Sequence, residues 1–98
     1  MQVLSRLEIE KKLSLLKNWE LKESNLYRKV CFDNYLQAID FVNKVAQLAE
    51  EQNHHPLLLI DYTTVKIKLS THDAGGITLK DFELALTIDK TKLKRFNF

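Results

Sequence analysis

Residues 53–70 read NHHPLLLIDYTTVKIKLS, and this stretch decides the fold. Pro56 cannot continue a helix, and the residue before a proline is pushed out of helical geometry, so a preceding helix must end here. The short apolar run from Leu57 to Tyr62 is suited to a buried strand. Residues 65–70 alternate between apolar and polar side chains, which is typical of a half-buried strand. The stretch therefore predicts a corner followed by two strands.

The segment before this corner is predicted to be a long helix that runs to Glu50. Asp33 or Asn34 can cap its start, and Gln37 stands three residues after Asn34, as in a capping box. The apolar residues that keep the helical period are Ala38, Val42, Val45, Ala46 and Ala49.

Two further helices are predicted toward the ends of the chain. Ser5 and Glu8 have the spacing of a capping box, and the apolar stripe that follows them stops near Asn18. Thr78 and Asp81 resemble another cap, so the third helix is expected to begin there.

Two more strands are predicted at Trp19–Leu21 and Leu26–Phe32, around a polar turn at residues 22–25. The elements then follow in the order helix, two strands, helix, two strands, helix. Because hairpin-linked strands form an antiparallel sheet, we expect one α+β domain over residues 1–98. Its four-stranded antiparallel sheet should carry three helices on one face.

The composition is that of an ordinary globular domain, with 45% hydrophobic and 29% charged residues. The lone Cys31 excludes an intramolecular disulfide and is interpreted as a buried or partly buried thiol. No apolar run approaches the length of a membrane span, so a cytoplasmic location and no membrane partner are expected. The net charge of +2 is too small to indicate nucleic acid. The basic residues Lys90, Lys92, Lys94 and Arg95 are expected at the solvated end of the third helix.

The three histidines, His54, His55 and His72, lie in two short segments where regular elements should end. Histidine gives and takes protons near pH 7, so three imidazoles around one pocket would suit acid-base chemistry. A second interpretation is that they merely decorate turns. A third is a metal site at Glu50, His54 and His72, which we rank below acid-base work because adjacent histidines rarely both reach one ion.

Two other features have competing interpretations. Trp19 is most simply a core residue, although an aromatic side chain at a strand start can also wall a pocket for a flat heterocycle. Gly75-Gly76 lacks the spacing and the lysine of a phosphate-binding loop and is interpreted as a tight turn.

Several segments together resemble the pterin-4a-carbinolamine dehydratase family. They are Asn53-His54-His55-Pro56 preceded by Glu50, Leu69-Ser70-Thr71-His72, and Gly75-Gly76-Ile77-Thr78 with Asp81. With Trp19 before the first hairpin, the resemblance spans nearly the whole chain. It implies the α+β fold expected above, a homo-oligomer (dimer or tetramer), no metal and no cofactor. It also implies dehydration of a 4a-hydroxytetrahydropterin to quinonoid dihydropterin in the recycling of tetrahydrobiopterin or a related pterin.

The resemblance also assigns residues. His54, His55 and His72 correspond to the catalytic histidines of the family. The positions that correspond to substrate contacts are Glu50, Asn53, His54, His55, Ser70, Thr71, His72, Asp73 and Trp19. Asn53 stands where many members have Asp, so a role that needs a carboxylate there is not expected in this chain.

The chemistry of such a reaction explains the histidines. The N5 lone pair of the pterin can expel the 4a hydroxyl once a general acid protonates it, and a base then takes the N5 proton. We expect His54 and His72 to be the principal donor and acceptor, with His55 assisting. The alternative is a non-catalytic binding or assembly protein on the same scaffold, since the family also includes coactivator-like members.

Overall fold

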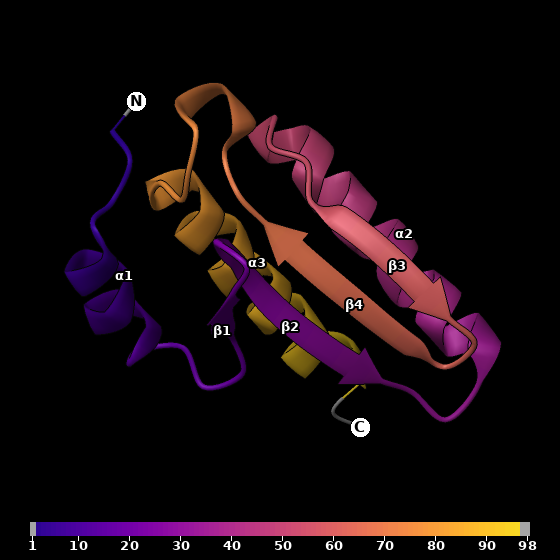
Figure 1. Ribbon diagram of the computed structural model, residues 1–98. Coiled ribbons are helices and arrows are strands. Elements are labelled where there is room, and N and C mark those ends of the chain that lie inside the picture. Colours follow the sequence, from indigo (N-terminus) through magenta and orange to yellow (C-terminus); the bar gives the residue numbers. More distant parts are fainter. Residues whose placement is uncertain (1, 97–98) are drawn as a thin grey trace.

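The structure is a computed structural model that describes residues 2–96, with side chains described up to residue 91. The elements in chain order are α1 (Arg6–Leu13), β1 (Glu20–Lys22), β2 (Asn25–Cys31), α2 (Tyr35–Gln52), β3 (Leu57–Asp61), β4 (Thr64–Leu69) and α3 (Leu79–Phe96), as Figure 1 shows. A single 3₁₀ turn, His72–Ala74, lies between β4 and α3. This is the predicted order of helices and strands.

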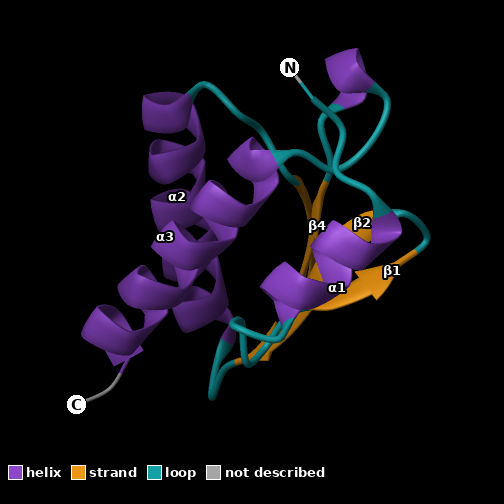
Figure 2. Ribbon diagram, turned by 90° about the vertical axis from the view of Figure 1, so that its left-hand side faces the viewer, coloured by secondary structure: helices purple, strands orange, loops and turns teal. Residues whose placement is uncertain are grey.

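The strands form one antiparallel sheet in the order β1-β2-β4-β3. Figure 2 shows α2 and α3 packed together on one side of the strands, with α1 near β1. All three helices contribute buried residues to one core with β2 and β4. Examples are Ile9, Phe41 and Ile88 from the helices and Val30, Val65 and Ile67 from the strands. The predicted α+β architecture is confirmed.

The capping predictions hold with one change of partner. Ser5 and Glu8 form a reciprocal capping box at the start of α1. Asn34 caps α2 by accepting the Gln37 amide at 2.9 Å, but the Gln37 side chain accepts the amide of Asp33 instead of that of Asn34.

Some boundaries differ from the predictions by a few residues. α1 ends at Leu13, well before Asn18, although Leu16 beyond it is still buried in the core. β1 begins one residue after Trp19, and the turn to β2 is only Glu23–Ser24, both in the left-handed region with φ of 51° and 63°. Two left-handed residues match the twist of a tight hairpin, which explains the shorter turn.

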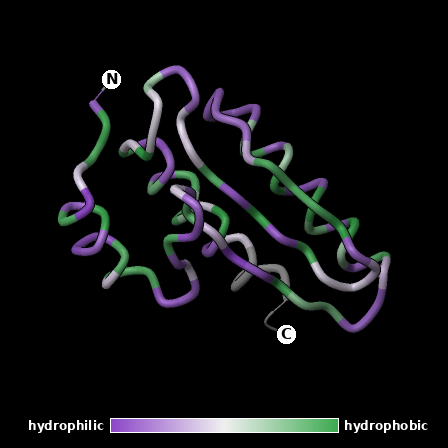
Figure 3. The backbone as a smooth tube through the Cα atoms, in the orientation of Figure 1, coloured by the Kyte–Doolittle hydropathy of each residue, from purple (hydrophilic) through white to green (hydrophobic). Residues whose placement is uncertain are grey.

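The prediction that Leu57–Tyr62 forms a buried strand was wrong in its burial. β3 is an edge strand that pairs only with β4, and Leu57 and Leu59 are 58% and 47% exposed. They pair with Lys68 and Lys66, so they lie on the sheet face away from the helices. In Figure 3, β3 is hydrophobic along most of its length, whereas β4 alternates. An all-apolar run therefore marked an exposed edge in this chain, not the middle of the sheet.

Cys31 is also a correction, because its thiol is exposed rather than buried. Its neighbour in sequence, Val30, points into the core, and the alternation of a strand turns Cys31 to the open face.

At the end of α3, Lys90 is exposed as expected, whereas the side chains of Lys92, Lys94 and Arg95 lie outside the described residues. Within residues 2–96, no helix combines the length and the apolar character that crossing a membrane requires.

Candidate functional site

The corner after α2 buries the side chain of His54 and leaves that of His55 exposed. Asn53 ends the helix in the left-handed region with φ of 50°, a conformation that asparagine tolerates well. The next amide, that of His54, still donates to the Ala49 carbonyl at 3.0 Å. This bond holds the chain against the helix end, so the residue His54 is only 9% exposed, while His55 is exposed.

The second histidine segment is a closed loop after β4. The Thr71 amide donates to the Gly76 carbonyl at 2.9 Å, and this pair closes the base of the loop. Gly75 has a φ of 80°, which glycine adopts without the steric cost that a side chain would bring. The exposed His72 and Asp73 lie at the start of the turn between these closing residues.

The two segments meet because the β3–β4 hairpin brings its own ends together. The chain leaves the corner along β3 and returns along β4, with Leu57 paired to Lys68. A pocket of about 310 Å³ lies between them. Its lining residues are Asn53, His54, His55, Ser70, Thr71, His72 and Asp73. All three histidines therefore face one pocket, at the lower end of the usual size range for small-molecule sites.

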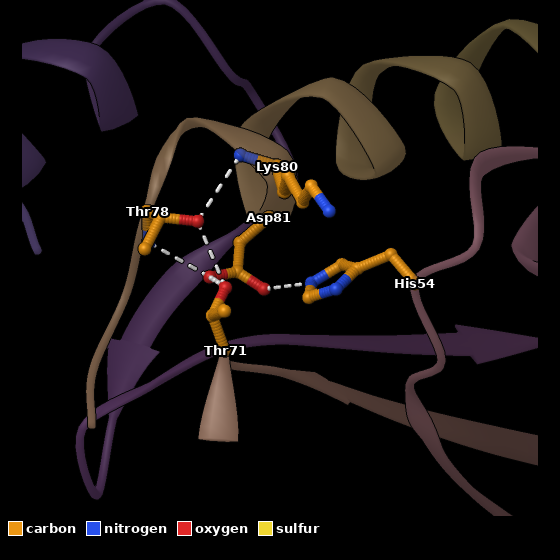
Figure 4. Close-up of polar contacts among 5 residues, drawn as sticks. All are labelled: His54, Thr71, Thr78, Lys80 and Asp81. Atoms are coloured by element: carbon orange, nitrogen blue, oxygen red, sulfur yellow. Dashed lines mark hydrogen bonds and ion pairs between the residues drawn. The ribbon is translucent and has the colours of Figure 1, made fainter. Parts of the chain in front are cut away.

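A buried carboxylate holds the inward histidine. His54 Nε2 lies 2.5 Å from Asp81 Oδ1, and Asp81 is fully buried (Figure 4). The other oxygen, Oδ2, accepts the hydroxyl of Thr71 and the amide of Thr78, each at 2.9 Å. An ionised carboxylate only accepts hydrogen bonds, so His54 Nε2 carries a hydrogen. In the neutral imidazole, Nδ1 is then the nitrogen with a free lone pair.

That free nitrogen is accessible from the pocket. No hydrogen bond joins His54 Nδ1 to any described residue, and Nδ1 is not among the buried polar atoms that lack a partner. Since His54 lines the pocket, Nδ1 can accept a proton from a molecule bound there.

His55 has a different environment. Its Nε2 lies 2.5 Å from Glu50 Oε2, and both side chains are exposed. Glu50 itself does not line the histidine pocket; it borders a shallow hollow on α2 with Ala46, Gln47 and Glu51. Glu50 thus contacts His55, which lines the pocket, without lining the pocket itself.

Trp19 lies apart from the other predicted site residues. Its side chain is buried in the core, and its Nε1 donates to Asp89 Oδ1 at 2.8 Å. Asp89 also pairs with the buried guanidinium of Arg28. The core interpretation of Trp19 is confirmed, and Trp19 is not among the residues that line the histidine pocket.

His54 and His55 are each paired with a carboxylate and are not gathered around a metal position. Among the described residues, no group of three or more His, Cys, Asp or Glu side chains could hold a metal ion. In particular, His54 bonds to Asp81 and Glu50 bonds to His55, so Glu50, His54 and His72 do not form the ligand set considered from the sequence.

Asp81 is the site residue that sequence reasoning missed. Its position three residues after Thr78 identified it as a helix cap, and the family-like segments included it without assigning it a role in the site. The structure shows that Oδ2 does accept the Thr78 amide. The same carboxylate uses Oδ1 to hold His54, which is 27 residues away in the chain. The available signal was a capping carboxylate just after the His72 loop, but no local pattern pairs it with His54.

Comparison with known proteins identifies the family of the chain. Residues 2–91 match the family described as Pterin 4 alpha carbinolamine dehydratase. A protein of Nostoc punctiforme, provisionally named pterin-4-alpha-carbinolamine dehydratase, is 45% identical over 91 residues, which cover 93% of this chain and 98% of that protein. A relative from Sulfurisphaera tokodaii with the same provisional name is 42% identical over 90 residues, which cover 92% and 97% of the two chains.

Solved structures show the same fold. A crystal structure from Brucella melitensis, titled transcriptional coactivator/pterin dehydratase, has a TM-score of 0.86 at 26% identity and covers 91% of this chain and 97% of that one. A pterin dehydratase-like RuBisCO assembly factor of the alpha-carboxysome has a TM-score of 0.64 at 24% identity, covers 76% and 89%, and shows the shared fold alone. From the match over most of its length, this chain belongs to the pterin 4 alpha carbinolamine dehydratase family.

Proposed function

We propose that the protein dehydrates a 4a-hydroxytetrahydropterin to quinonoid dihydropterin and water by general acid-base catalysis. The observation that carries this proposal is the convergence of His54, His55 and His72 on one pocket, with His54 held by the buried Asp81. A pterin is a flat bicyclic heterocycle whose polar edges offer donors and acceptors, and the pocket is lined by the polar groups that can meet them.

The reaction needs one proton delivered and one removed. The N5 lone pair forms a double bond to C4a while the C4a–O bond breaks, and an acid protonates the departing hydroxyl so that it leaves as water. The N5 proton then passes to a base, which gives the quinonoid product. The acid loses one proton and the base gains one, so the protein returns to its starting state by exchange with solvent.

His54 is suited to be the base. Asp81 holds Nε2–H, so Nδ1 presents its lone pair to the pocket in a fixed orientation. A buried carboxylate also stabilises the imidazolium that forms when Nδ1 takes the N5 proton. In other enzymes too, a buried carboxylate holds a histidine base in the tautomer and orientation that proton transfer needs.

His72 is then the acid and His55 the assisting residue. His72 lies across the pocket from the α2 corner on an exposed turn, where exchange with solvent can restore its proton. His55 is paired with Glu50, which orients its ring at the pocket rim.

The direct test is turnover of freshly generated 4a-hydroxytetrahydropterin by the wild-type protein and by His54→Ala and His72→Ala variants. We expect each substitution to lower kcat by about 10²- to 10⁴-fold, because each removes a positioned proton-transfer group. Lys29→Ala on the open face of the sheet is the control and should keep full activity. Wild-type rates in both histidine variants would exclude the assigned site.

The second candidate function is non-catalytic binding or assembly. It is favoured by the solved relative whose title names it a transcriptional coactivator as well as a pterin dehydratase. It predicts that a variant without the three histidines still captures a stable partner, while the wild-type protein shows no turnover of the pterin.

Two further properties belong to this proposal. We expect the protein to act in the cytoplasm, where reduced pterins are recycled, and to form a homo-oligomer. The exposed apolar edge strand β3 supports the second expectation, because an unpaired strand edge can pair with another copy.

A further inference from the structure

A relay of hydrogen bonds runs from the start of α3 to His54, and its direction follows from counting protons. Thr71 has one hydroxyl proton, which it donates to Asp81 Oδ2 at 2.9 Å. The 2.8 Å contact between the Thr71 and Thr78 hydroxyls then makes Thr78 the donor. Thr78 Oγ1 in turn accepts the Lys80 amide at 3.3 Å. Every proton in the relay therefore points toward Asp81.

The direction of the relay constrains the histidine. Asp81 Oδ2 is already occupied by two donors, and Oδ1 receives a third hydrogen bond from His54 Nε2. The fully buried carboxylate is thus the acceptor of all three hydrogen bonds. The relay thereby selects the His54 tautomer that leaves Nδ1 open to the pocket.

The backbone of Thr71 forms the first hydrogen bonds of the turn that contains His72. The Thr71 carbonyl accepts the amides of Ala74 at 3.1 Å and Gly75 at 3.0 Å, and its amide donates to the Gly76 carbonyl at 2.9 Å. Its side chain is nearly buried, with 8% of the residue exposed. Thr71 thus bonds through its hydroxyl to Asp81, which holds His54. Through its backbone it bonds to the turn that contains His72.

We propose that Thr71 is a positioning residue that sets His54 and His72 relative to each other, rather than a group that recognises the substrate through its side chain. The inference deepens the proposed dehydration and rests on it for its kinetic consequence. Its structural consequence, the tautomer of His54, can be measured without any turnover.

The test compares Thr71→Val, which keeps the shape but removes the hydroxyl, with Thr71→Ser, which keeps the hydroxyl. Thr64→Val, at the start of β4 and outside the histidine pocket, is the matched control. The readouts are the ¹⁵N shifts of the histidine rings, which report the tautomer, and kcat and KM for the 4a-hydroxypterin.

With Thr71→Val we expect a mixed His54 tautomer and a kcat lowered by about 10- to 100-fold with little change in KM, because Asp81 keeps only one of two orienting donors on Oδ2. Thr71→Ser and Thr64→Val should match the wild type. A wild-type tautomer and kcat with a raised KM in Thr71→Val would overturn the proposal and place the hydroxyl on the substrate.

A second measurement, on the wild-type protein, tests the proposal even if Thr71→Val does not fold. In the wild-type protein the relay predicts slowly exchanging hydroxyl protons on Thr71 and Thr78 and a hydrogen on His54 Nε2. Finding the hydrogen on Nδ1 instead would refute the relay. A protein that shows the predicted tautomer but no dehydratase activity would retain the positioning role and refute only the proposed reaction.

Discussion

At the scale of single residues, the site depends on one side chain that performs two tasks. Asp81 Oδ2 caps α3 by accepting the Thr78 amide, and Oδ1 holds His54 in one orientation. The helix cap thereby places a carboxylate where the catalytic proposal needs it. The capping task could be predicted from the spacing of Thr78 and Asp81, whereas the contact with His54 depends on how the α2 corner packs against α3.

The dual role leads to a prediction for Asp81→Asn. The amide is neutral, so it stabilises an imidazolium at His54 less well, and it can present a donor instead of an acceptor to Nε2. We expect kcat for the proposed dehydration to fall by about 100-fold or more, measured by stopped-flow turnover. Asp61→Asn, an exposed carboxylate at the end of β3, is the control. Equal loss in both variants would show that Asp81 acts through net charge and not through His54.

At the scale of elements, capping and turn chemistry made the boundaries predictable where the partners are close in sequence. The Ser5–Glu8 box starts α1 as expected, and Asn34 starts α2. The end of α1 and the burial of β3 were not predictable in the same way. They depend on which neighbour each segment meets, and no pattern within a few residues contains that information.

The capping box predicts a pH-dependent contribution of Glu8 to stability. The hydrogen bond from the Ser5 amide lowers the pKa of Glu8 below its usual value, with the Ser5 hydroxyl as the next cause. A carboxyl whose pKa is lower in the folded state stabilises the fold above its unfolded pKa and loses that effect as pH falls through its folded pKa. Glu8→Gln should therefore be less stable than wild type at pH 7 and should approach it in acid, measured by urea unfolding. Glu10→Gln on the same helix is the control, and a constant difference across pH would contradict the assignment.

Gly75 and Gly76 in the His72 loop avoid two different costs of a side chain, backbone strain at Gly75 and a steric clash at Gly76. Single and double substitutions can separate these two costs. A Cβ at Gly76 would lie 2.8 Å from Val3 Cγ1, whereas Gly75 has open space around it but a φ of 80°. We expect Gly75→Ala to destabilise by about 1 kcal/mol through backbone strain alone. Gly76→Ala should also destabilise, and Val3→Ala in the same chain should relieve part of that loss, as measured by urea unfolding. Strictly additive effects of Val3→Ala and Gly76→Ala would show that the two residues do not meet.

At the scale of the whole molecule, the sheet has one face covered by helices and an exposed apolar edge strand, β3. β3 exposes Leu57 and Leu59 next to unpaired backbone groups, and the exposed Tyr62 follows in the turn to β4. Soluble proteins usually cover such an arrangement. The histidine pocket lies at the start of β3, between the corner after α2 and the loop after β4. Covering the β3 edge with a second copy would therefore place that copy beside the pocket.

We accordingly predict that the protein is a dimer or tetramer in solution. A Leu57→Lys/Leu59→Lys variant should shift to smaller species in light scattering, because lysines oppose edge-to-edge pairing. Leu15→Lys, which changes an exposed leucine beyond α1, should leave the assembly unchanged. A monomeric wild-type protein would contradict the prediction.

The sequence by itself determined the type and order of the helices and strands. The family-like segments also predicted nine substrate contacts, of which seven line the pocket, whereas Glu50 and Trp19 do not. These follow from periodicity, caps and the family-like segments, which are legible in the chain itself. Only the tertiary structure decided that β3 is an exposed edge, that Trp19 packs away from the histidines, and that Asp81 holds His54. The physical reason is distance along the chain: strand order and buried hydrogen-bond partners are selected by how the whole core closes, not by neighbouring residues.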